Sequence, residues 1–130
     1  MLDPMFYLHI YYCTNTVPSS PPRSVQGQAV NSRQIFLSWD LPEPTGRNGI
    51  IISYTILVLE IITDSELTYN VTNRTAFLIE QLHPHYDYRC SVAASTAVGI
   101  GPFSAPFVVK TDEDSEPVYE LNLKCAWQQG

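Results

Sequence analysis

The chain of 130 residues carries a formal charge of −6 at pH 7, from 13 acidic and 7 basic side chains, and 45% of its residues are hydrophobic. This length provides one domain with extensions, whose core needs no metal ion or disulfide for support. The acidic balance argues against binding to nucleic acid, because such a surface needs clustered lysine and arginine. No apolar run is as long as a membrane span, so we expect no direct membrane insertion by this segment.

Residues 1–20 are predicted to be an N-terminal extension that ends in a proline-rich linker. The first 17 residues are apolar and aromatic, but Asp3 and Pro4 stand where a secretory signal would have a basic start. We therefore interpret them as an extension or the start of a fragment, and a signal peptide remains the alternative. The prolines of the PSSPPR stretch that follows favour a stiff, extended spacer.

Seven short strands are predicted in the next 90 or so residues, because apolar and polar residues alternate along each of them. In chain order they cover residues 25–30, 34–40, 50–60, 66–71, 75–80, 88–94 and 105–110. Prolines and a glycine rule out a helix in the loop at 41–49, and Gly99, Gly101 and Pro102 are predicted to form the turn before the last strand. This succession is typical of an all-β, two-sheet sandwich.

The alternation also predicts which side chains face the core. Three sets share an inward face: Ile35, Leu37 and Trp39; Tyr54, Ile56 and Val58; and Leu67, Tyr69 and Val71. Asn70 should then face outward. The other face of the third strand is apolar too, through Ile51, Leu57 and Leu59, and would be exposed or covered by a neighbour.

Trp39 and the cysteines distinguish between families of sandwich. An immunoglobulin domain has a cysteine on its second strand, a tryptophan on its third and a second cysteine late in the chain. The late segment from Tyr88 to Cys90 fits that pattern. The second strand, however, has no cysteine and itself carries Trp39, so the immunoglobulin interpretation fails.

Residues 21–111 instead resemble a fibronectin type III domain. Trp39 precedes a proline-rich loop, as the core tryptophan of that family does, and NGIIISYTI contains the expected third-strand tyrosine, Tyr54. Leu82, Pro84 and Tyr88 match the family's leucine–proline–tyrosine corner, and VAASTAVGIGPFS resembles the penultimate strand with the entry to the last one. The resemblance implies a seven-stranded, immunoglobulin-like sandwich in which the Tyr88 hydroxyl bonds to nearby backbone. Cys90 departs from the family, where an aliphatic residue is more usual.

The two flanks resemble the halves of the linker that joins consecutive repeats, and residues 112–130 are predicted to be an acidic linker with a C-terminal extension. The sequence of the third strand and of the late hairpin is similar to that of ectodomain repeats of receptor-type tyrosine phosphatases, especially the many-repeat, Q-like kind. This implies a non-catalytic extracellular module, secreted or outside the plasma membrane, that acts as spacer and protein-recognition unit in a receptor or adhesion protein. Its partners would be neighbouring repeats and a protein ligand, and any phosphatase activity would lie outside this chain.

A soluble, cytokine-receptor-like ligand-binding module is the alternative. It would need paired cysteines in the first half of the domain and a WSxWS-like run near the last strand, and the sequence has neither. The integrin-binding RGD tripeptide of some family members is also absent, since Arg47, Asn48 and Gly49 do not replace it.

Two acceptor triplets for N-linked glycosylation are the candidate modification sites. They are Asn70-Val71-Thr72 and Asn73-Arg74-Thr75, and the second asparagine should lie in the turn after the fourth strand. Because the two are so close, we expect occupancy of both together less than occupancy of one.

No residues predict catalysis, a cofactor or a metal site. His83 and His85 flank Pro84 with Asp87 nearby, but a tight corner directs such side chains apart, so we interpret them as surface turn residues. The histidines lie beside no apparent nucleophile. Cys90 has the inward parity of a small hydrophobic residue, whereas a bridge between Cys13 and Cys125 stays open.

Overall fold

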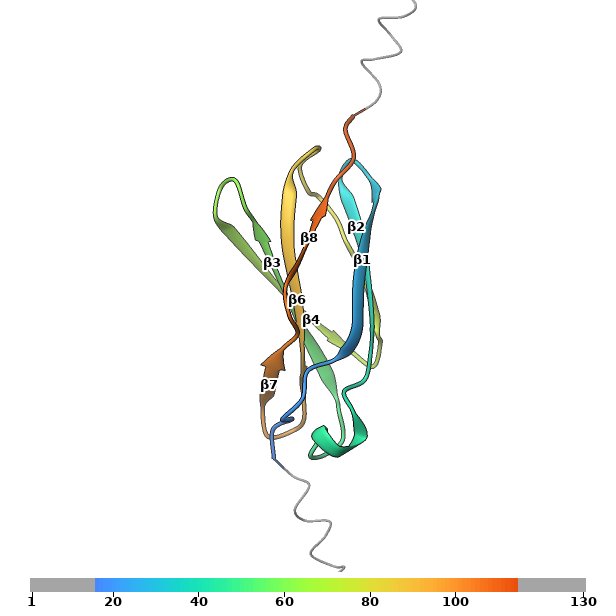
Figure 1. Cartoon of the computed structure of the whole chain (residues 1–130), viewed down its shortest axis with the longest axis vertical. Coiled ribbons are helices and arrows are strands. Elements are labelled where there is room, and N and C mark those ends of the chain that lie inside the picture. The colour runs from blue at the N-terminus through green and yellow to red at the C-terminus, as the bar shows by residue number, and fades with distance from the viewer. Residues whose placement is uncertain (1–15, 115–130) are drawn as a thin grey trace, which may run out of the picture.

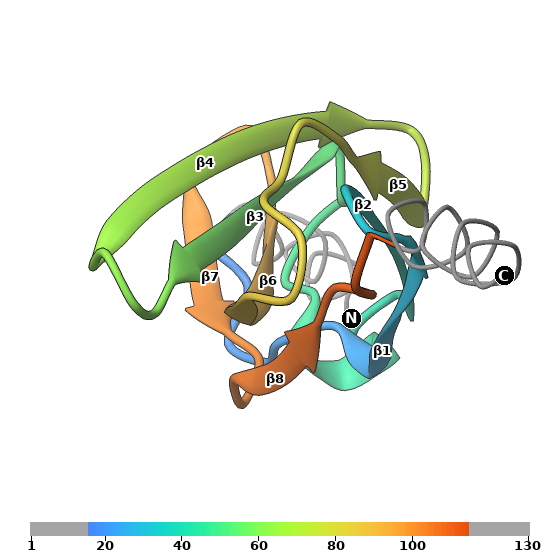
Figure 2. The same cartoon turned by 90° about the horizontal axis from the view of Figure 1, so that it is seen from above.

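The computed structural model describes residues 16–114, which form two antiparallel sheets packed face to face (Figures 1 and 2). One sheet has the order β1-β2-β5 and the other the order β4-β3-β6-β7, with β8 also paired to β6. The strands are β1 (Arg23–Asn31), β2 (Gln34–Asp40), β3 (Ser53–Glu60), β4 (Ser65–Thr72), β5 (Ala76–Ile79), β6 (Asp87–Ser95), β7 (Ile100–Phe103) and β8 (Phe107–Lys110). The predicted all-β sandwich is confirmed.

The core lies between the sheets and is built from alternate residues of the central strands. Ile35, Leu37 and Trp39 of β2 and Tyr54, Ile56 and Val58 of β3 are all buried, as their alternation predicts. Val92 and Ala94 of β6 join them. Burying such side chains stabilises the fold by roughly 1.5–3 kcal/mol for each large aliphatic one.

The last predicted strand, residues 105–110, is β8 in the structure, and a further strand, β7, lies in the region predicted to be the turn before it. β7 and β8 are separated at residues 104–106, where the backbone N–H of Ser104 donates to the Val92 carbonyl (2.8 Å) and the Ser104 hydroxyl accepts from the Val92 N–H (3.0 Å). Pro106 then offers no N–H to the ladder. Gly101 and Pro102, predicted to form a turn, lie in β7, whose position at the sheet edge tolerates a proline.

A single 3₁₀ turn, η1 (Pro44–Gly46), occupies the loop in which a helix was ruled out. That prediction was wrong by this one turn. A proline fits the first position of a helical turn, where its missing N–H has no partner to lose. The turn closes through the N–H of Gly46, which donates to the Glu43 carbonyl at 2.8 Å.

Burial departs from the predicted pattern on β4 and β6. Leu67 was predicted to face the core but is 40% exposed, because the β3–β4 hairpin projects beyond the facing sheet (Figure 2). On β6 the prediction of a half-buried strand is wrong in its centre, since residues 90–94 are buried on both faces. β6 lies between β3 on one side and β7 and β8 on the other, so neighbours shield its outer face.

Candidate functional site

The corner before β6 is held by the side chain of Tyr88. This residue is fully buried, and its hydroxyl accepts a hydrogen bond of 2.8 Å from the backbone N–H of His83. Burial raises the pKa of Tyr88, while the bond from His83 opposes the rise. Leu82 is buried beside it and its N–H donates to the Arg33 carbonyl at 3.0 Å, and Pro84 is half-buried at the turn. The side chains of the corner stabilise the fold, and their polar groups are occupied by hydrogen bonds within it.

Trp39 and Tyr54 meet between the two sheets. Their rings contact edge to face with centroids 5.2 Å apart, a favourable geometry for aromatic pairs. Burial raises the pKa of Tyr54, and Arg47 and the Trp39 indole oppose the rise. Among the described residues the indole Nε1–H has no partner at normal hydrogen-bond geometry, so its contact with the Tyr54 hydroxyl is at most weak.

The histidines and Asp87 do not converge on one point. His83 Nδ1 lies 3.1 Å from Glu60, His85 Nδ1 lies 3.5 Å from Glu113, and Asp87 pairs with Lys110 at 3.7 Å. Within residues 16–114 no three side chains of the metal-binding types come together. Each candidate ligand thus has its own partner.

Cys90 is fully buried as a free thiol in the core. Burial raises the pKa of this thiol to about 12. A thiol that stays protonated is a poor nucleophile and metal ligand, so Cys90 packs as a small hydrophobic side chain. Cys13 and Cys125 lie outside the described residues.

The two glycosylation triplets lie on the exposed end of β4 and the turn that follows it. Asn70 projects from β4, and its Oδ1 accepts a 3.1 Å hydrogen bond from the Thr55 hydroxyl. That bond leaves the amide nitrogen, the atom a glycan would modify, out of the contact. Asn73 is exposed and has a left-handed backbone with φ of 55°, which asparagine tolerates in turns.

Residues 16–20 lie across the end of the sandwich where the β2–β3 and β6–β7 loops meet, and we call this the entry end (Figure 1). Five hydrogen bonds fix the segment: Thr16 N–H to Asn48 O (3.0 Å), Asn48 Nδ2–H to Val17 O (3.0 Å), Ser19 N–H to Gly46 O (2.9 Å), Ser20 N–H to Gly46 O (3.2 Å) and Thr96 Oγ1–H to Thr16 O (2.8 Å). The segment is therefore part of the domain's hydrogen-bonded structure.

Two glycines make room for this segment. Pro18 is fully buried against Gly101, where an added Cβ would lie 2.7 Å from both the Cβ and the carbonyl oxygen of Pro18. An added Cβ on Gly46 would lie 2.0 Å from the Ser20 hydroxyl. Composition alone predicted a stiff spacer here. The spacing of Gly46 and Gly101 in the sequence gives no signal that they face residues 18 and 20.

The opposite end of the sandwich, where residues 111–114 leave the last strand, is called the exit end (Figure 1). The backbone N–H of Asp112 donates to the Asn31 carbonyl at 3.3 Å, and the N–H of His85 donates to the Asp112 carbonyl at 3.1 Å. The Ser32 hydroxyl donates to Asp114 at 2.7 Å. The chain is thus hydrogen-bonded to the sandwich where it enters and where it leaves.

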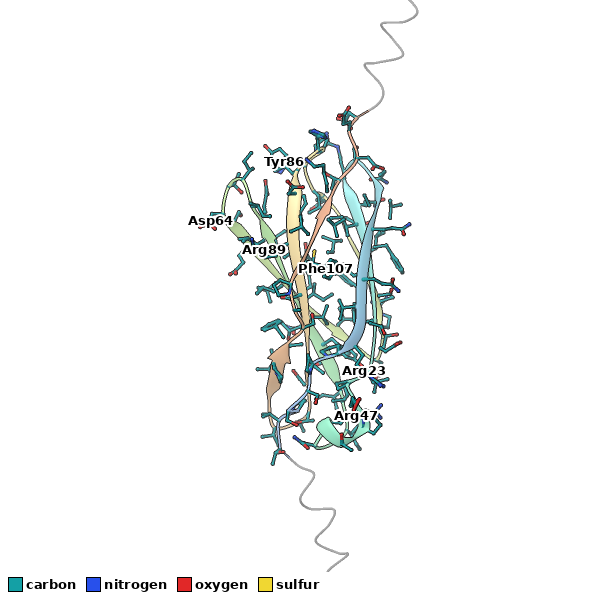
Figure 3. The ribbon with its side chains drawn as sticks, in the orientation of Figure 1. Arg23, Arg47, Asp64, Tyr86, Arg89 and Phe107 are labelled. Carbon is teal, nitrogen blue, oxygen red and sulfur yellow. The ribbon has the colours of Figure 1, made fainter. Side chains whose placement is uncertain are left out.

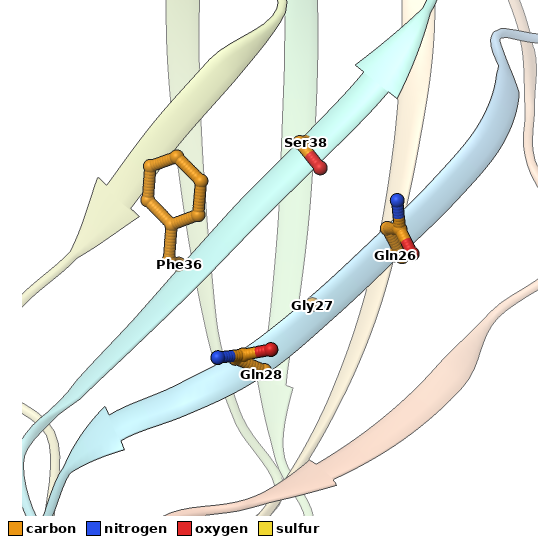
Figure 4. A pocket seen from close by; sticks show the side chains of 5 residues that line it. All are labelled: Gln26, Gly27, Gln28, Phe36 and Ser38. Atoms are coloured by element: carbon orange, nitrogen blue, oxygen red, sulfur yellow. The ribbon is translucent and has the colours of Figure 1, made fainter.

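The outer face of the three-stranded sheet is exposed and slightly hollowed (Figure 4). Gln26 and Gln28 of β1 and Phe36 and Ser38 of β2 line the hollow, and the Phe36 ring projects from it. Its apolar side chain and amide groups suit contact with another protein better than binding of a small ligand, since the hollow is open. No helix in the described part of the chain has the length and hydropathy that a membrane crossing requires.

The comparisons agree with this architecture. A family model for the fibronectin type III domain matches residues 20–110. Tyrosine-protein phosphatase Lar of Drosophila melanogaster is 40% identical over 123 residues, covering 86% of this chain and 6% of that protein. Human Roundabout homolog 2 is 40% identical over 122 residues (89% and 9%), and human phosphatidylinositol phosphatase PTPRQ is 35% identical over 114 residues (85% and 5%). The chain thus spans less than a tenth of these relatives.

A solved structure shares both sequence and fold. The crystal structure of the FN5 domain of Drosophila Lar superposes with a TM-score of 0.63 at 31% identity, covering 75% of this chain and 100% of that one. The predicted similarity to repeats of receptor-type tyrosine phosphatases is confirmed by these relatives.

Proposed function

Because this chain belongs to the fibronectin type III family, we propose that it is an extracellular spacer and protein-recognition unit in a multi-repeat, membrane-anchored receptor or adhesion protein. The fibronectin type III domain is itself non-catalytic. Phosphatase activity of a parent receptor would belong to a part of it that this chain does not contain. The partners would be neighbouring repeats and a protein ligand.

The observation that carries the spacer role is the fixed attachment of the chain at two opposite ends. Thr16 and Ser19 are bonded at the entry end, and Asp112 is bonded at the exit end. A repeat that holds its flanking residues in this way transmits its orientation to its neighbours, so that successive repeats would form a rod. A flexible linker would instead let each domain tumble by itself.

The recognition role is supported by the exposed faces of the sheets. Phe36 and the neighbouring glutamines offer an apolar centre with a polar surround, the composition found in many interfaces. Loops and faces on a rigid scaffold are the usual positions of binding residues. From this composition we infer that the ligand presents an uncharged, partly apolar protein surface.

Amide hydrogen exchange on the full chain tests the spacer role. We expect the amides of Thr16 and Ser19 to exchange far more slowly than the exposed amide of Thr63 in the β3–β4 turn, because the first two are hydrogen-bonded. Exchange of Thr16 and Ser19 at the rate of Thr63 would mean a flexible entry segment and would overturn the proposed rod geometry.

An extracellular location also makes one of the two asparagine triplets a glycosylation site. Secretion of the full chain from a glycosylating host should give a band that peptide-N-glycosidase F shifts. Asn70→Gln and Asn73→Gln, each alone and together, would identify the occupied residue. A band that the glycosidase leaves unchanged would contradict glycosylation in that host.

A further inference from the structure

Charge is distributed unevenly along the long axis of the sandwich. Arg23 and Arg47 lie at the entry end and Asp64 at the opposite end (Figure 3). The exit end and the adjacent strand ends carry eight carboxylates: Glu60, Asp64, Glu66, Glu80, Asp87, Asp112, Glu113 and Asp114. Three side chains with a permanent positive charge, Arg33, Arg89 and Lys110, lie among them, so the acidic groups are in excess. The entry end carries Arg23, Arg47 and Arg74 with Asp40 and Glu43, so it is slightly basic.

The entry end is also apolar where the chain enters. Ile50 is 81% exposed, Val98 is 58% exposed and Val17 is 39% exposed. Hydrogen bonds place these residues together, since Asn48 is bonded to Thr16 and Val17, and Thr96 is bonded to Thr16. A Cβ added to Gly99 would lie 3.2 Å from Val17 Cγ1, so the β6–β7 loop touches the same side chain. An apolar surface with a basic surround is the result.

The exit end offers a complementary surface. Ile62 at the tip of the β3–β4 hairpin is 71% exposed, and Ile61 beside it is partly exposed. Asp64 follows in the same turn. An apolar tip with an acidic surround therefore stands opposite an apolar surface with a basic surround on the same molecule.

We propose that the entry end docks, head to tail, on the exit end of another domain of this kind. This docking rests on the proposed role as a repeat, and the partner is a neighbouring repeat. Ile50, Val98 and Val17 form the apolar centre of the contact, and the surrounding opposite charges set its direction. Contact between two entry ends would leave like charges facing one another. A head-to-tail contact is heterologous and open-ended, so separate copies should associate into chains as their concentration rises.

An NMR dilution series on the full chain tests the contact. At about millimolar concentration and low salt we expect concentration-dependent shifts at Ile50 and Val98 and, equally, at Ile62 and Asp64. The amides of Gln28 and Phe36 on the outer sheet face should not shift. Raising the salt should weaken the association because charges near the surface are screened.

Two variants at one exposed position separate charge from apolar contact. Ile50→Asp should weaken self-association by roughly tenfold or more, the equivalent of about 1.4 kcal/mol. Ile50→Lys should retain more of it, because lysine faces the acidic exit end. Phe36→Asp is the control: Phe36 is 44% exposed on the outer face of the three-stranded sheet, and its change should leave association as in the unmodified chain.

Other results would overturn the docking without touching the spacer role. These are the absence of shifts at millimolar concentration, shifts confined to the sheet faces, and equal losses in Ile50→Asp and Ile50→Lys. Shifts at Ile50 that appear on deletion of residues 1–15, but do not depend on concentration, would also overturn it. The entry end would then contact the chain's own N-terminal residues instead of another domain. Slow exchange of Thr16 and Ser19 would remain valid in each case.

Discussion

The hydroxyl of Thr111 donates a 2.7 Å hydrogen bond to the backbone carbonyl of His83. The same hydroxyl accepts a 3.0 Å bond from the Tyr86 N–H, and the N–H of His83 is bonded to Tyr88. Both backbone groups of His83 are therefore held by side chains of later strands or their ends. Since Thr111 directly precedes the acidic exit residues, the tyrosine corner also fixes where the chain leaves the domain.

Replacing Thr111 by valine should destabilise the domain by roughly 2–4 kcal/mol. Valine has nearly the same shape, but it leaves the His83 carbonyl and the Tyr86 N–H without this partner in a buried position. Thr111→Ser is the matched control, which keeps the hydroxyl and loses one methyl group, at a cost of about 0.8 kcal/mol. Urea unfolding of the full chain measures both. Equal losses in the two variants would show that packing, rather than hydrogen bonding, holds the exit.

Tyr88→Phe should lower the free energy of unfolding by roughly 1–3 kcal/mol. The ring stays in the core, and only the acceptor of the His83 N–H is lost. Tyr86→Phe serves as control in the same segment, because no hydrogen bond joins the Tyr86 hydroxyl to another described residue, and it should change stability little. Denaturant midpoints decide the matter. An unchanged midpoint in Tyr88→Phe would argue that water replaces the tyrosine at the partly exposed His83.

Stability should fall in alkaline solution because of Cys90. Burial raises its pKa to about 12 in the folded chain, from an ordinary value of 9.0 for a cysteine in water. A raised pKa means that the folded state keeps its proton after the unfolded state has lost it, so the contribution is complete below pH 9 and is lost between pH 9 and pH 12. The slope approaches about 1.4 kcal/mol per pH unit.

The comparison with Cys90→Ala isolates this contribution. The variant is less stable at pH 7 because of the cavity, yet its stability should fall less steeply between pH 9 and pH 10. The tyrosines Tyr54, Tyr69 and Tyr88, whose pKa values burial also raises, contribute mainly above pH 10. Unfolding under reducing conditions at several pH values gives the two slopes. Parallel slopes would mean that the thiol ionises equally in both states.

The features that alternation determines could be predicted from the sequence. The residues of β2 and β3 that face the core follow from period 2, because each side chain's face depends only on its place along the strand. The leucine–proline–tyrosine corner is equally local, with Leu82, Pro84 and Tyr88 within seven positions. For such features the interacting residues, or the period that orders them, lie within one short segment.

Features that depend on contacts between distant segments could not be predicted. The break between β7 and β8 arises because Ser104 bonds to Val92, twelve residues earlier. The burial of Pro18 depends on the missing side chain of Gly101, on the other side of the domain's sequence. The separation of charge between the ends follows from the topology, which brings the β3–β4 hairpin, the β5–β6 connection and the residues after β8 to one end. A linear pattern carries none of this information.

The attachment of the entry segment gives a last prediction, in which two nearby glycines serve as test and control. Gly101→Ala should destabilise the domain by roughly 1–3 kcal/mol, because the new methyl group would lie 2.7 Å from the buried Pro18 and its carbonyl oxygen. Gly99→Ala meets only Val17 Cγ1, at 3.2 Å, on an exposed side chain that can turn away, and should have little effect.

Hydrogen exchange then locates the damage. In Gly101→Ala the amide of Ser19, bonded to the Gly46 carbonyl, should exchange faster by more than the global loss of stability accounts for, because the segment is pushed off its site. The amide of Leu82, bonded to Arg33 at the other end, should follow the global loss alone. If the exchange rates of the Ser19 and Leu82 amides rose by the same factor, the entry segment would unfold only with the whole domain. Gly101→Ala would then destabilise the core in general, and not the contact with Pro18 in particular.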